Sequence, residues 1–538
     1  MRSCELQPDG VPEPSGAITM ALFVESWLTE LLVALSLVIV AAYAWFSHRY
    51  RYWHKKGVPY LEPQFPFGNV YESFVGKRPL TLIISDAYRQ FKGKRFGGIY
   101  IVTQPTLVTV DPDFIRDVLV KDFGTFHDRG IRVDENEPLG KHLFLLEGSK
   151  WRRLRVKLTP TFTSGKMKMM FQTMAACGRE MAEVLQGPAD TGEVVEMREV
   201  AARYATDVIA SVAFGIEVDC QRNPDDPFRQ WGRRVFEANA LATINFLISA
   251  INPKLLTTFR IRSNASAVSQ YFRGMVRDTV KHREDNGITR NDFMHLLIQL
   301  KNKGCIDSDK SVNRKDNDDE DNWRLSIDDI AAQAFVFFIA GFETSSSTVS
   351  FALHELAFNP DIQSRVREEI DAVLKENKGE VTYEAVNNMH YLDKVVAETL
   401  RKYPPAPVLS RESNAEYQLP DSDIILEKGT KVFIPMYGLH HDPEYFPDPE
   451  RFDPERFSEE QKAQRHPYVY LPFGEGPRIC IGMRFGLLQT KVALTYMLSR
   501  FSFEPSEKSV HHLTFEPRSF VLMPKGGIQL KMRKRNQL

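Results

Sequence analysis

The chain has 538 residues, of which 43% are hydrophobic and 11% aromatic, and its formal net charge is −1. A chain of this length and apolar content can bury a large core, and its near-neutral charge gives no sign of a nucleic-acid partner. The five cysteines are scattered and lack C-x-x-C spacing. This pattern argues against a disulfide framework or a zinc ribbon and favours a reducing compartment.

The N-terminal part is predicted to anchor the chain in a membrane. Residues 1–19 are polar, contain proline and glycine and show no periodicity, so we expect a disordered leader. Leu31–Phe46 is uncharged and mostly apolar, and the run reaches about 20 residues, the length that spans a bilayer, when it is extended back to Trp27. We therefore predict a membrane anchor over residues 20–47. A cleaved signal peptide is the alternative, and the acidic residues before the run argue against it.

The orientation and the segment that follows can be predicted from charge and proline. A basic cluster with Arg49, Arg51, Lys55 and Lys56 comes directly after the apolar run, and the positive-inside rule then places the bulk of the chain in the cytosol. Residues 48–70 also contain several prolines, which favour a stiff, extended backbone. We expect this segment to be a basic, proline-rich hinge between the anchor and a globular body. Translation from Met1 or from Met20 is compatible with this organisation.

A short β region is expected before helices take over. Ile99–Val102 and Leu107–Val110 are β-rich runs on either side of Gln104-Pro105, which predicts a hairpin. Asp111-Pro112 is a helix start, because proline is favoured in the first turn. Helical patterns dominate from there to the C-terminal region.

One long helix is expected to cross the middle of the molecule. Ser326–Asp329 is typical of a capping box, and the helical pattern from Ile327 to Phe358 would be about 48 Å long. Glycine and hydroxyl residues at 341–347 could open its hydrogen-bond ladder and bend it. Before this helix, the polar stretch 302–325 carries a run of acidic residues, and we expect a solvated loop there.

A cysteine loop stands out near the C-terminus. Residues 473–482 contain one cysteine, three glycines and a proline, and an apolar helical stretch, Met483–Phe501, follows at once. Glycines let the backbone approach a ligand closely, and a sulfur at a helix N-terminus meets N–H groups that favour the thiolate. We therefore predict that Cys480 ligates a metal and that Arg478 contacts an anionic part of the same ligand. The alternative, a small core cysteine, is the commoner role of a lone cysteine.

The whole loop resembles the heme-binding signature F-x-x-G-x-R-x-C-x-G of the cytochrome P-450 superfamily, with Phe473, Gly476, Arg478, Cys480 and Gly482 at the fixed positions. The resemblance implies a single large, mostly helical domain with a smaller β region, here over residues 71–538. It also implies heme b as cofactor, with Cys480 as the iron's thiolate ligand and the other signature residues around it.

Two further motifs resemble those of the same superfamily. Ala340–Ser345 resembles the oxygen-activation motif, in which Glu343 and Thr344 would deliver protons during oxygen activation; the alternative is that Thr344 only bonds its own helix. Glu398 and Arg401 resemble the E-x-x-R motif, and Arg456 lies in a segment that resembles P-E-R-F. By resemblance these last three form a buried charged triad, whereas such a pair alone is usually solvated.

Other residues are expected at the cofactor's carboxylates. Trp151 and Arg155 resemble the family's W-x-x-x-R, and their i,i+4 spacing puts them on one helix face. Arg411 matches a further propionate-binding arginine. The stretches Phe126–Gly130 and Lys157–Met167 resemble the insect detoxification branch, family six.

A substrate pocket is predicted on one face of the long helix. Val336, Phe337, Ala340 and Thr344 recur at helical spacing, so if Thr344 faces the iron, the others face the same cavity. By resemblance, the segment Phe126–Phe144 and the turn that contains Val408 supply the remaining walls. His127 is the ionisable candidate in these walls, or it only caps a turn. The predicted pocket residues are Phe126, His127, Phe144, Val336, Phe337, Ala340 and Val408.

The resemblance implies a monooxygenase that inserts one oxygen atom from O₂ into lipophilic substrates, namely xenobiotics such as plant toxins or insecticides, or endogenous lipids and hormones. NADPH electrons would arrive through a flavoprotein reductase, with cytochrome b-five as an optional second donor. The expected location is the endoplasmic reticulum membrane, held by the single N-terminal anchor, with the catalytic domain facing the cytosol. Two alternatives are an O₂-independent heme-thiolate isomerase or synthase, and a non-catalytic heme-binding carrier.

Overall fold

The computed structural model describes residues 27–132, 137–236, 248, 266–306 and 323–535, and these divide into two units with a boundary after Arg49. The predicted leader, residues 1–19, and most of the acidic stretch lie outside the described residues. The first unit contains helix α1, Trp27–Arg49, whose apolar side chains are mostly exposed. Two described stretches, Thr29–Lys56 and Ile327–Phe358, are long and apolar enough to cross a membrane, but 67% of the second is buried inside the protein.

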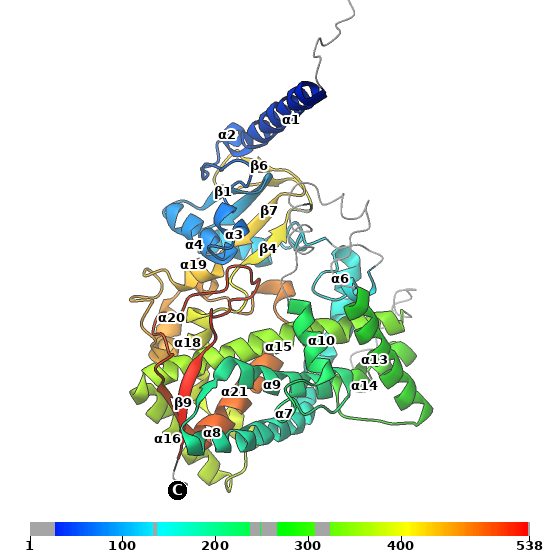
Figure 1. Ribbon diagram of the computed structural model, residues 1–538, viewed down its shortest axis with the longest axis vertical. Coiled ribbons are helices and arrows are strands. Elements are labelled where there is room, and N and C mark those ends of the chain that lie inside the picture. Colours follow the sequence, from blue (N-terminus) through cyan, green and yellow to red (C-terminus); the bar gives the residue numbers. More distant parts are fainter. Residues whose placement is uncertain (1–26, 133–136, 237–247, 249–265, 307–322, 536–538) are drawn as a thin grey trace, which may run out of the picture. The chain divides into compact units, whose positions relative to one another are not determined.

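The second unit, from Tyr50 onward, is mostly helical (Figure 1). Its described α-helices are α2 Tyr52–Lys56, α3 Tyr71–Phe74, α4 Leu80–Gln90, α5 Pro112–Arg116, α6 Gly148–Leu158, α7 Ser164–Val184, α8 Gln186–Thr191, α9 Met197–Ile209, α10 Pro227–Phe236, α13 Ser266–Asp285, α14 Phe293–Asn302, α15 Ile327–Phe358, α16 Pro360–Glu376, α17 Tyr383–Asn387, α18 His390–Lys402, α19 Met436–His440, α20 Glu459–Gln464 and α21 Met483–Arg500. Short 3₁₀ or π turns are η1 Asp117–Lys121, η2 Pro138–Gly140, η3 Thr159–Phe162, η4 Ala210–Phe214, η5 Pro454–Phe457, η6 Pro467–Val469 and η7 Gly476–Arg478.

The strands form three small sheets. Their bounds are β1 Phe96–Ile101, β2 Gln104–Thr109, β3 Val194–Glu196, β4 Leu409–Glu412, β5 Tyr417–Gln418, β6 Ile425–Leu426, β7 Lys431–Ile434, β8 Phe501–Pro505 and β9 Gln529–Lys534. The largest sheet has the order β1-β2-β7-β4, in which only β2 and β7 run parallel. The antiparallel pairing of β1 with β2 confirms the predicted hairpin, and the Asp111 carboxylate accepts from the Asp113 N–H at the start of α5, as the predicted helix start requires.

Helix α15 lies at the centre of the core. Its bounds, Ile327–Phe358, are those predicted from the sequence. The Ser326 hydroxyl accepts from the Asp329 N–H (3.1 Å) and the Asp329 carboxylate accepts from the Ser326 N–H (2.9 Å), which is the predicted capping box. The helix packs against α9, α21, α13 and α18 (Figure 1). It runs unbroken through residues 341–347, because hydroxyls there donate to carbonyls of their own helix without opening the ladder.

The structure corrects the prediction of a separate hinge over residues 48–70. From Tyr50 onward, the segment 48–70 belongs to the globular unit and is packed onto β1. The Trp53 ring is fully buried and its Nε1 donates to the Ile99 carbonyl (3.0 Å), and Tyr60 forms a bridge to Gly98. The prolines do stiffen this segment, but non-local contacts with the sheet, rather than extension alone, hold it.

A buried carboxylate in α9 makes the stability of this unit depend on pH. Asp207 is buried and accepts from the Cys220 N–H (2.8 Å), and burial raises the pKa of this carboxyl to about 6. Its ordinary value is about 3.9, so the folded protein holds the proton more tightly, and stability falls as pH rises from about 4 to about 6. Above that range the ionised carboxylate costs up to about 3 kcal/mol.

We therefore expect Asp207→Asn to raise the apparent melting temperature at pH 7 and to flatten its dependence on pH between 4 and 6. The Asn oxygen still accepts from Cys220, while the buried charge is gone. Thermal unfolding of the heme-loaded protein at several pH values measures this. Asp190→Asn, at a largely exposed partner of Lys534, is the matched control and should change little. A variant that melts below the parent at pH 7 would contradict the assigned pKa direction.

Candidate active site

The cysteine loop is held by a second segment of the chain. The Cys480 N–H donates to the Phe473 carbonyl (2.9 Å), which closes the loop, and η1 packs against η7. Gly476 has φ +74°, and a Cβ there would clash with the Leu119 carbonyl oxygen of η1. Gly476 is therefore required twice, for its backbone conformation and for this close approach.

The surroundings of Cys480 differ from the prediction that the loop and the helix N-terminus favour the thiolate. Its side chain is exposed, although the surrounding protein desolvates the sulfur, as expected of a thiol that faces an enclosed space. Burial raises the pKa of the Cys480 thiol, and the Gly482 N–H and the cations Arg155 and Arg129 lower it by less. The loop and helix α21 therefore do not favour the thiolate by themselves as predicted; a bound cation would supply the missing stabilisation.

Four guanidinium groups gather near this sulfur. Arg478 donates to Asp128 Oδ1 (3.1 Å) and lies 4.2 Å from the centroid of the Trp151 ring. Arg155 donates to the Ile479 carbonyl (2.9 Å), directly beside the cysteine. Burial and mutual repulsion lower the pKa values of Arg411 and Arg478 to about 10, with Asp128 partly compensating at Arg478.

Arg129 is the fourth cation, and the sequence analysis did not select it. Its guanidinium lies 4.2 Å from the centroid of the Phe144 ring, and burial together with Arg411 and Arg478 lowers its pKa. The signal was available, because Arg129 lies inside the Phe126–Gly130 stretch that was noted only as a branch resemblance.

The residues present fit heme b. Buried donors without a hydrogen-bond partner remain on Arg478, at Nε and Nη1, and on Arg411, at Nε. Unpaired buried cations are costly, so this cluster is built for an anionic ligand, and two carboxylates beside an iron would satisfy it. Within the described residues, no group of three or more His, Cys, Asp or Glu side chains could hold a metal ion. Ligation of heme iron needs only one protein sulfur, and Cys480 is the residue predicted for it.

One face of α15 is left open. Ala340 is exposed and Val336, Gly341 and Thr344 are half-buried, although the helix around them is mostly buried. The Thr344 hydroxyl donates to the Ala340 carbonyl (2.5 Å). This stripe has the spacing that the pocket prediction requires.

Phe337 has aromatic neighbours on one side. Its ring stacks on Phe162 at a centroid distance of 5.0 Å and lies 4.1 Å from the ring centroid of Phe293. These contacts pack one side of Phe337 against η3 and α14, while the side chain stays half-buried like that of Val336, so its place in the pocket stays a prediction.

Glu343 is paired with a residue of α9 at the edge of the open stripe. Its buried carboxylate pairs with Arg198 at the start of α9 (2.6 Å) and lies within 3.4 Å of the Ser347 hydroxyl. Arg198 is partly exposed, so a single ion pair separates Glu343 from solvent.

The other predicted pocket residues have different surroundings. Phe126 is fully buried against Tyr417 (ring centroids 4.8 Å apart), and His127 Nδ1 lies 2.9 Å from the Gly124 carbonyl oxygen and 2.8 Å from Asn414 Nδ2. Both side chains therefore pack a turn, as the second interpretation of His127 expected, and neither of these contacts is to α15.

Two predicted pocket residues, Phe144 and Val408, remain as candidate walls of the pocket. Phe144 is partly exposed beneath Arg129, and Val408 is half-buried just before β4, whose Leu409 lies against Gly474 of the cysteine loop. A third segment was missed by sequence reasoning. The Leu522 N–H donates to the Pro405 carbonyl (3.1 Å), which ties the loop carrying the exposed Phe520 to the same turn.

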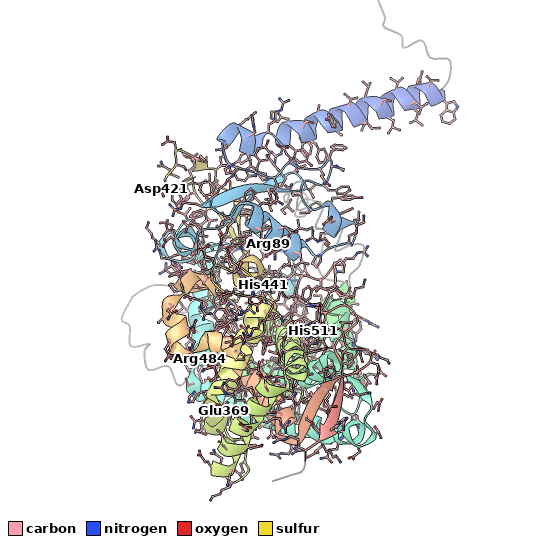
Figure 2. The ribbon with its side chains drawn as sticks, turned by 90° about the vertical axis from the view of Figure 1, so that its left-hand side faces the viewer. Arg89, Glu369, Asp421, His441, Arg484 and His511 are labelled. Atoms are coloured by element: carbon pink, nitrogen blue, oxygen red, sulfur yellow. The ribbon has the colours of Figure 1, made fainter. Side chains whose placement is uncertain are left out.

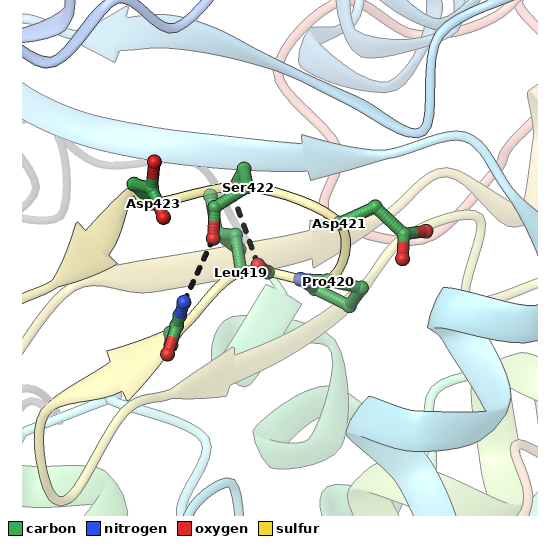
Figure 3. A pocket seen from close by; sticks show the side chains of 6 residues that line it. Leu419, Pro420, Asp421, Ser422 and Asp423 are labelled. Atoms are coloured by element: carbon green, nitrogen blue, oxygen red, sulfur yellow. Dashed lines mark hydrogen bonds between the residues drawn. The ribbon is translucent and has the colours of Figure 1, made fainter.

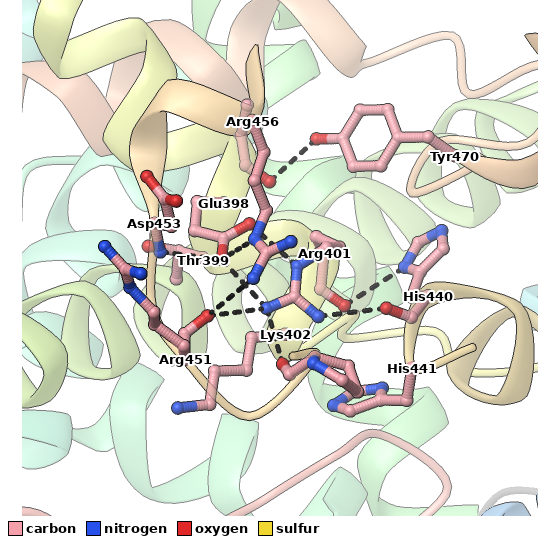
Figure 4. Close-up of polar contacts among 12 residues, drawn as sticks. Glu398, Thr399, Arg401, Lys402, His440, His441, Arg451, Asp453, Arg456 and Tyr470 are labelled. Atoms are coloured by element: carbon pink, nitrogen blue, oxygen red, sulfur yellow. Dashed lines mark hydrogen bonds and ion pairs between the residues drawn. The ribbon is translucent and has the colours of Figure 1, made fainter. Parts of the chain in front are cut away.

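The predicted charged triad is present (Figure 4). Arg401 Nε and Nη2 donate to the two carboxylate oxygens of Glu398 (2.7 and 2.8 Å), and Arg456 Nε lies 3.4 Å from Glu398 Oε1. Glu398 and Arg401 are both fully buried.

The triad is connected to the cysteine loop through one histidine. Arg401 Nη1 donates to the His440 carbonyl (2.9 Å), and His440 Nε2 accepts from the Leu471 N–H (3.0 Å), two residues before Phe473. The triad therefore fixes the approach to the loop rather than contacting the cofactor.

A separate hollow of about 490 Å³ lies at the turn between β5 and β6, lined by Gln418–Asp423 (Figure 3). Gln418 Nε2 donates to the Ser422 carbonyl (3.0 Å), and Asp421 pairs with Arg95. Figure 2 shows Asp421 at the edge of the body, away from His441. We assign this open turn no role.

Comparisons with known proteins agree with this site. The family model described as Cytochrome P450 matches residues 65–532. Cytochrome P450 6k1 of Blattella germanica is 44% identical over 508 residues, which cover 94% of this chain and 97% of that protein. Cytochrome P450 6a2 of Drosophila melanogaster is 42% identical over 509 residues (93% and 99%), and cytochrome P450 6A1 of Musca domestica is 40% identical over 508 residues (93% and 97%).

The match covers both the helical body and the cysteine loop, and the relatives carry the family-six designation that the sequence resembled. Members of this family use heme b, O₂ and NADPH-derived electrons passed on by a reductase. The chain therefore belongs to the cytochrome P450 family and is a heme-thiolate monooxygenase.

Proposed function

We propose that this monooxygenase oxidises lipophilic xenobiotics, such as plant toxins or insecticides, or endogenous lipids and hormones. The observation that carries the proposal is the open, mostly apolar stripe of α15, which the oxygen-activation resemblance of Thr344 would direct toward the heme. A large site lined by apolar side chains selects ligands by shape more than by charge. When bound, heme b supplies the redox chemistry that activates O₂.

Each residue of the site has a defined task in this proposal. Cys480 holds the iron, and Phe473 and Gly476 keep the loop in the shape that presents the sulfur. Arg478, together with its neighbours, binds the carboxylate edge of the heme through the donors that are otherwise unpartnered. The neighbours in this role are Trp151, Arg155, Arg411 and Arg129.

Glu343 and Thr344 are proposed to handle protons. The Thr344 hydroxyl donates its hydrogen bond to the Ala340 carbonyl, and its oxygen can still accept a proton or a hydrogen bond. Glu343 is the neighbour of Thr344 in the chain, and its carboxylate is held by the partly exposed Arg198. Together they would place an exchangeable proton beside the substrate while the apolar stripe excludes bulk water.

Thr344→Ala tests this role. We expect unchanged heme content and substrate affinity, but a fall of about tenfold or more in product formed per NADPH consumed, because the hydroxyl oxygen that would hold an exchangeable proton beside the substrate is lost. Stoichiometry with added reductase measures it, with peroxide as the alternative product. Thr348→Ala is the matched control, since that hydroxyl only donates to the Thr344 carbonyl one turn further along (2.8 Å). Equal coupling in the two variants would refute the proton role.

Ala340→Phe tests the pocket. A phenyl ring at this exposed position should lower the affinity of bulky ligands by about thirtyfold, since an overfilled site costs on the order of 2 kcal/mol. Small ligands and carbon monoxide should bind as before. Ligand-induced changes in the heme spectrum give both affinities. Unaltered binding of bulky ligands would mean that this face of α15 does not line the pocket.

Membrane attachment is proposed from α1 and the basic residues that follow it. The exposed apolar side chains of α1 support a single N-terminal anchor in the endoplasmic reticulum membrane, with the catalytic domain in the cytosol. Its partners there would be an NADPH-dependent flavoprotein reductase and, as a second donor, cytochrome b-five. Carbonate extraction of membranes that carry the full chain, compared with a chain lacking residues 1–46, measures the attachment.

A further inference from the structure

Asp128 is a buried carboxylate that pairs with one member of the arginine cluster. The residue is 7% exposed, and its Oδ1 accepts from Arg478 Nη2 (3.1 Å) and from the Gly148 N–H at the start of α6 (2.9 Å). Its backbone is held as well, because the Asp128 carbonyl accepts from the Glu412 N–H of β4 (2.9 Å). Asp128 therefore joins the start of α6, the end of β4 and the cysteine loop.

The guanidinium of Arg478 has one nitrogen held by the protein and two that are free. Nη2 donates to Asp128 and to the Leu146 carbonyl (2.9 Å), and the guanidinium carbon lies 4.2 Å from the centroid of the Trp151 ring. Nε and Nη1 are buried and have no hydrogen-bond partner. Because the donors of a guanidinium form a rigid, planar fork, the contact at Nη2 sets the direction in which Nε and Nη1 point.

The same contact reduces the positive charge that the cluster presents. The four guanidinium groups near Cys480 carry four positive charges, and Asp128 places a negative charge in direct contact with one of them. Reduction of ferric to ferrous heme adds an electron, so a nearby cation favours the ferrous form and a nearby anion favours the ferric form. The side chains of Arg478 and Asp128 are only 1% and 9% exposed, so solvent screens their charges weakly.

We propose that Asp128 is a positioning residue for the monooxygenase reaction, which directs Arg478 toward a heme carboxylate and lowers the reduction potential of the bound heme. The inference rests on the proposed function, because it takes the free donors of Arg478 to bind that carboxylate. As a consequence, the iron accepts its first electron less readily than it would beside four cations without a carboxylate partner.

The test is a potentiometric titration of the heme-loaded full chain without substrate, followed by the ferric and ferrous absorbance spectra. Asp128→Asn removes the charge but keeps an oxygen that accepts from Gly148 and Arg478. We expect it to raise the ratio of ferrous to ferric heme at a fixed potential by about tenfold, which is about 59 mV for one electron. Asp128→Ala also removes the oxygen, so it should lower the heme content per polypeptide below that of the Asn variant.

The matched control is Glu412→Gln. Glu412 is as buried as Asp128 (7% exposed) and belongs to the same region, but its carboxylate pairs with the partly exposed Arg132 (2.6 Å). Its removal should shift the ratio by less than about threefold, because solvent compensates an exposed guanidinium. Asp128→Ser, which keeps a hydroxyl acceptor, replaces the Asn variant if that protein does not fold.

Three results would overturn the inference: an unchanged potential in Asp128→Asn, an equal rise in Glu412→Gln, and equal heme contents in Asp128→Ala and Asp128→Asn. A purely structural role of Asp128 would lower the heme content and leave the potential of the loaded fraction unchanged. Arg478→Gln separates this inference from the proposed function. A lower potential in that variant, with no effect of Asp128→Asn, would refute the inference alone, whereas normal heme content and potential in both would refute the placement of Arg478 at the heme.

Discussion

Cys480→Ser will abolish the thiolate-type absorbance of the ferrous carbon monoxide complex and, with it, NADPH-driven product formation. A serine hydroxyl keeps the shape of the side chain but offers no soft, electron-donating ligand. The Gly482 N–H and the Arg155 and Arg129 cations, which are arranged to support a negative sulfur, would then face a neutral oxygen. Absorbance spectra of the reduced, carbon monoxide-treated protein measure the change.

The matched control for this change is Cys305→Ser, because Cys305 is an exposed, free cysteine. It should keep the full spectrum and activity. If Cys480→Ser also kept the band, the iron would have another ligand, and the assignment of the loop would have to be given up.

Glu398→Ala is expected to prevent accumulation of heme-loaded protein. Removing the carboxylate leaves Arg401 buried without its counter-ion, and breaking a buried pair in this way costs about 3–5 kcal/mol. That is a large share of the roughly 5–15 kcal/mol that stabilise a typical domain. The Asp453 N–H, which donates to Glu398 Oε1 (2.9 Å), loses its acceptor as well.

Heme content per polypeptide and the apparent melting temperature measure this effect. Glu455→Ala is the control, since Glu455 pairs with Arg365 and Lys394 at the partly exposed edge of the same region. Partly exposed pairs contribute up to about 1 kcal/mol, so this variant should load heme normally. Equal behaviour of the two variants would show that the triad is an ordinary surface pair.

The fold was predictable wherever its signals are local. The capping box at Ser326 and the hairpin around Gln104-Pro105 depend on neighbours within a few residues, and both were confirmed. The segment 48–70 was misjudged because its position depends on Trp53 meeting Ile99, 46 residues away. Proline content reports backbone stiffness and says nothing about such distant partners.

The site shows the same division. The signature identified Cys480 and Arg478 by their spacing, and the structure brings Trp151 and Arg155 to the same place. Sequence could not decide whether His127 faces a substrate or packs a turn, because its partner Asn414 lies 287 residues away. Nor could it show that Phe337, unlike Val336, packs against the rings of Phe162 and Phe293, which come from distant segments.

The contact between Gly476 and the Leu119 carbonyl has a consequence for chimeric enzymes. The cysteine loop and the turn η1 are more than 350 positions apart in the chain, yet the backbone of one fills the space that a side chain of the other would need. A cysteine loop transplanted from a relative without that relative's η1 turn therefore lacks the backbone segment that packs against it. Exchanges between family members should therefore replace residues 117–121 and 473–482 together, although a single crossover in the gene would not transfer both segments alone.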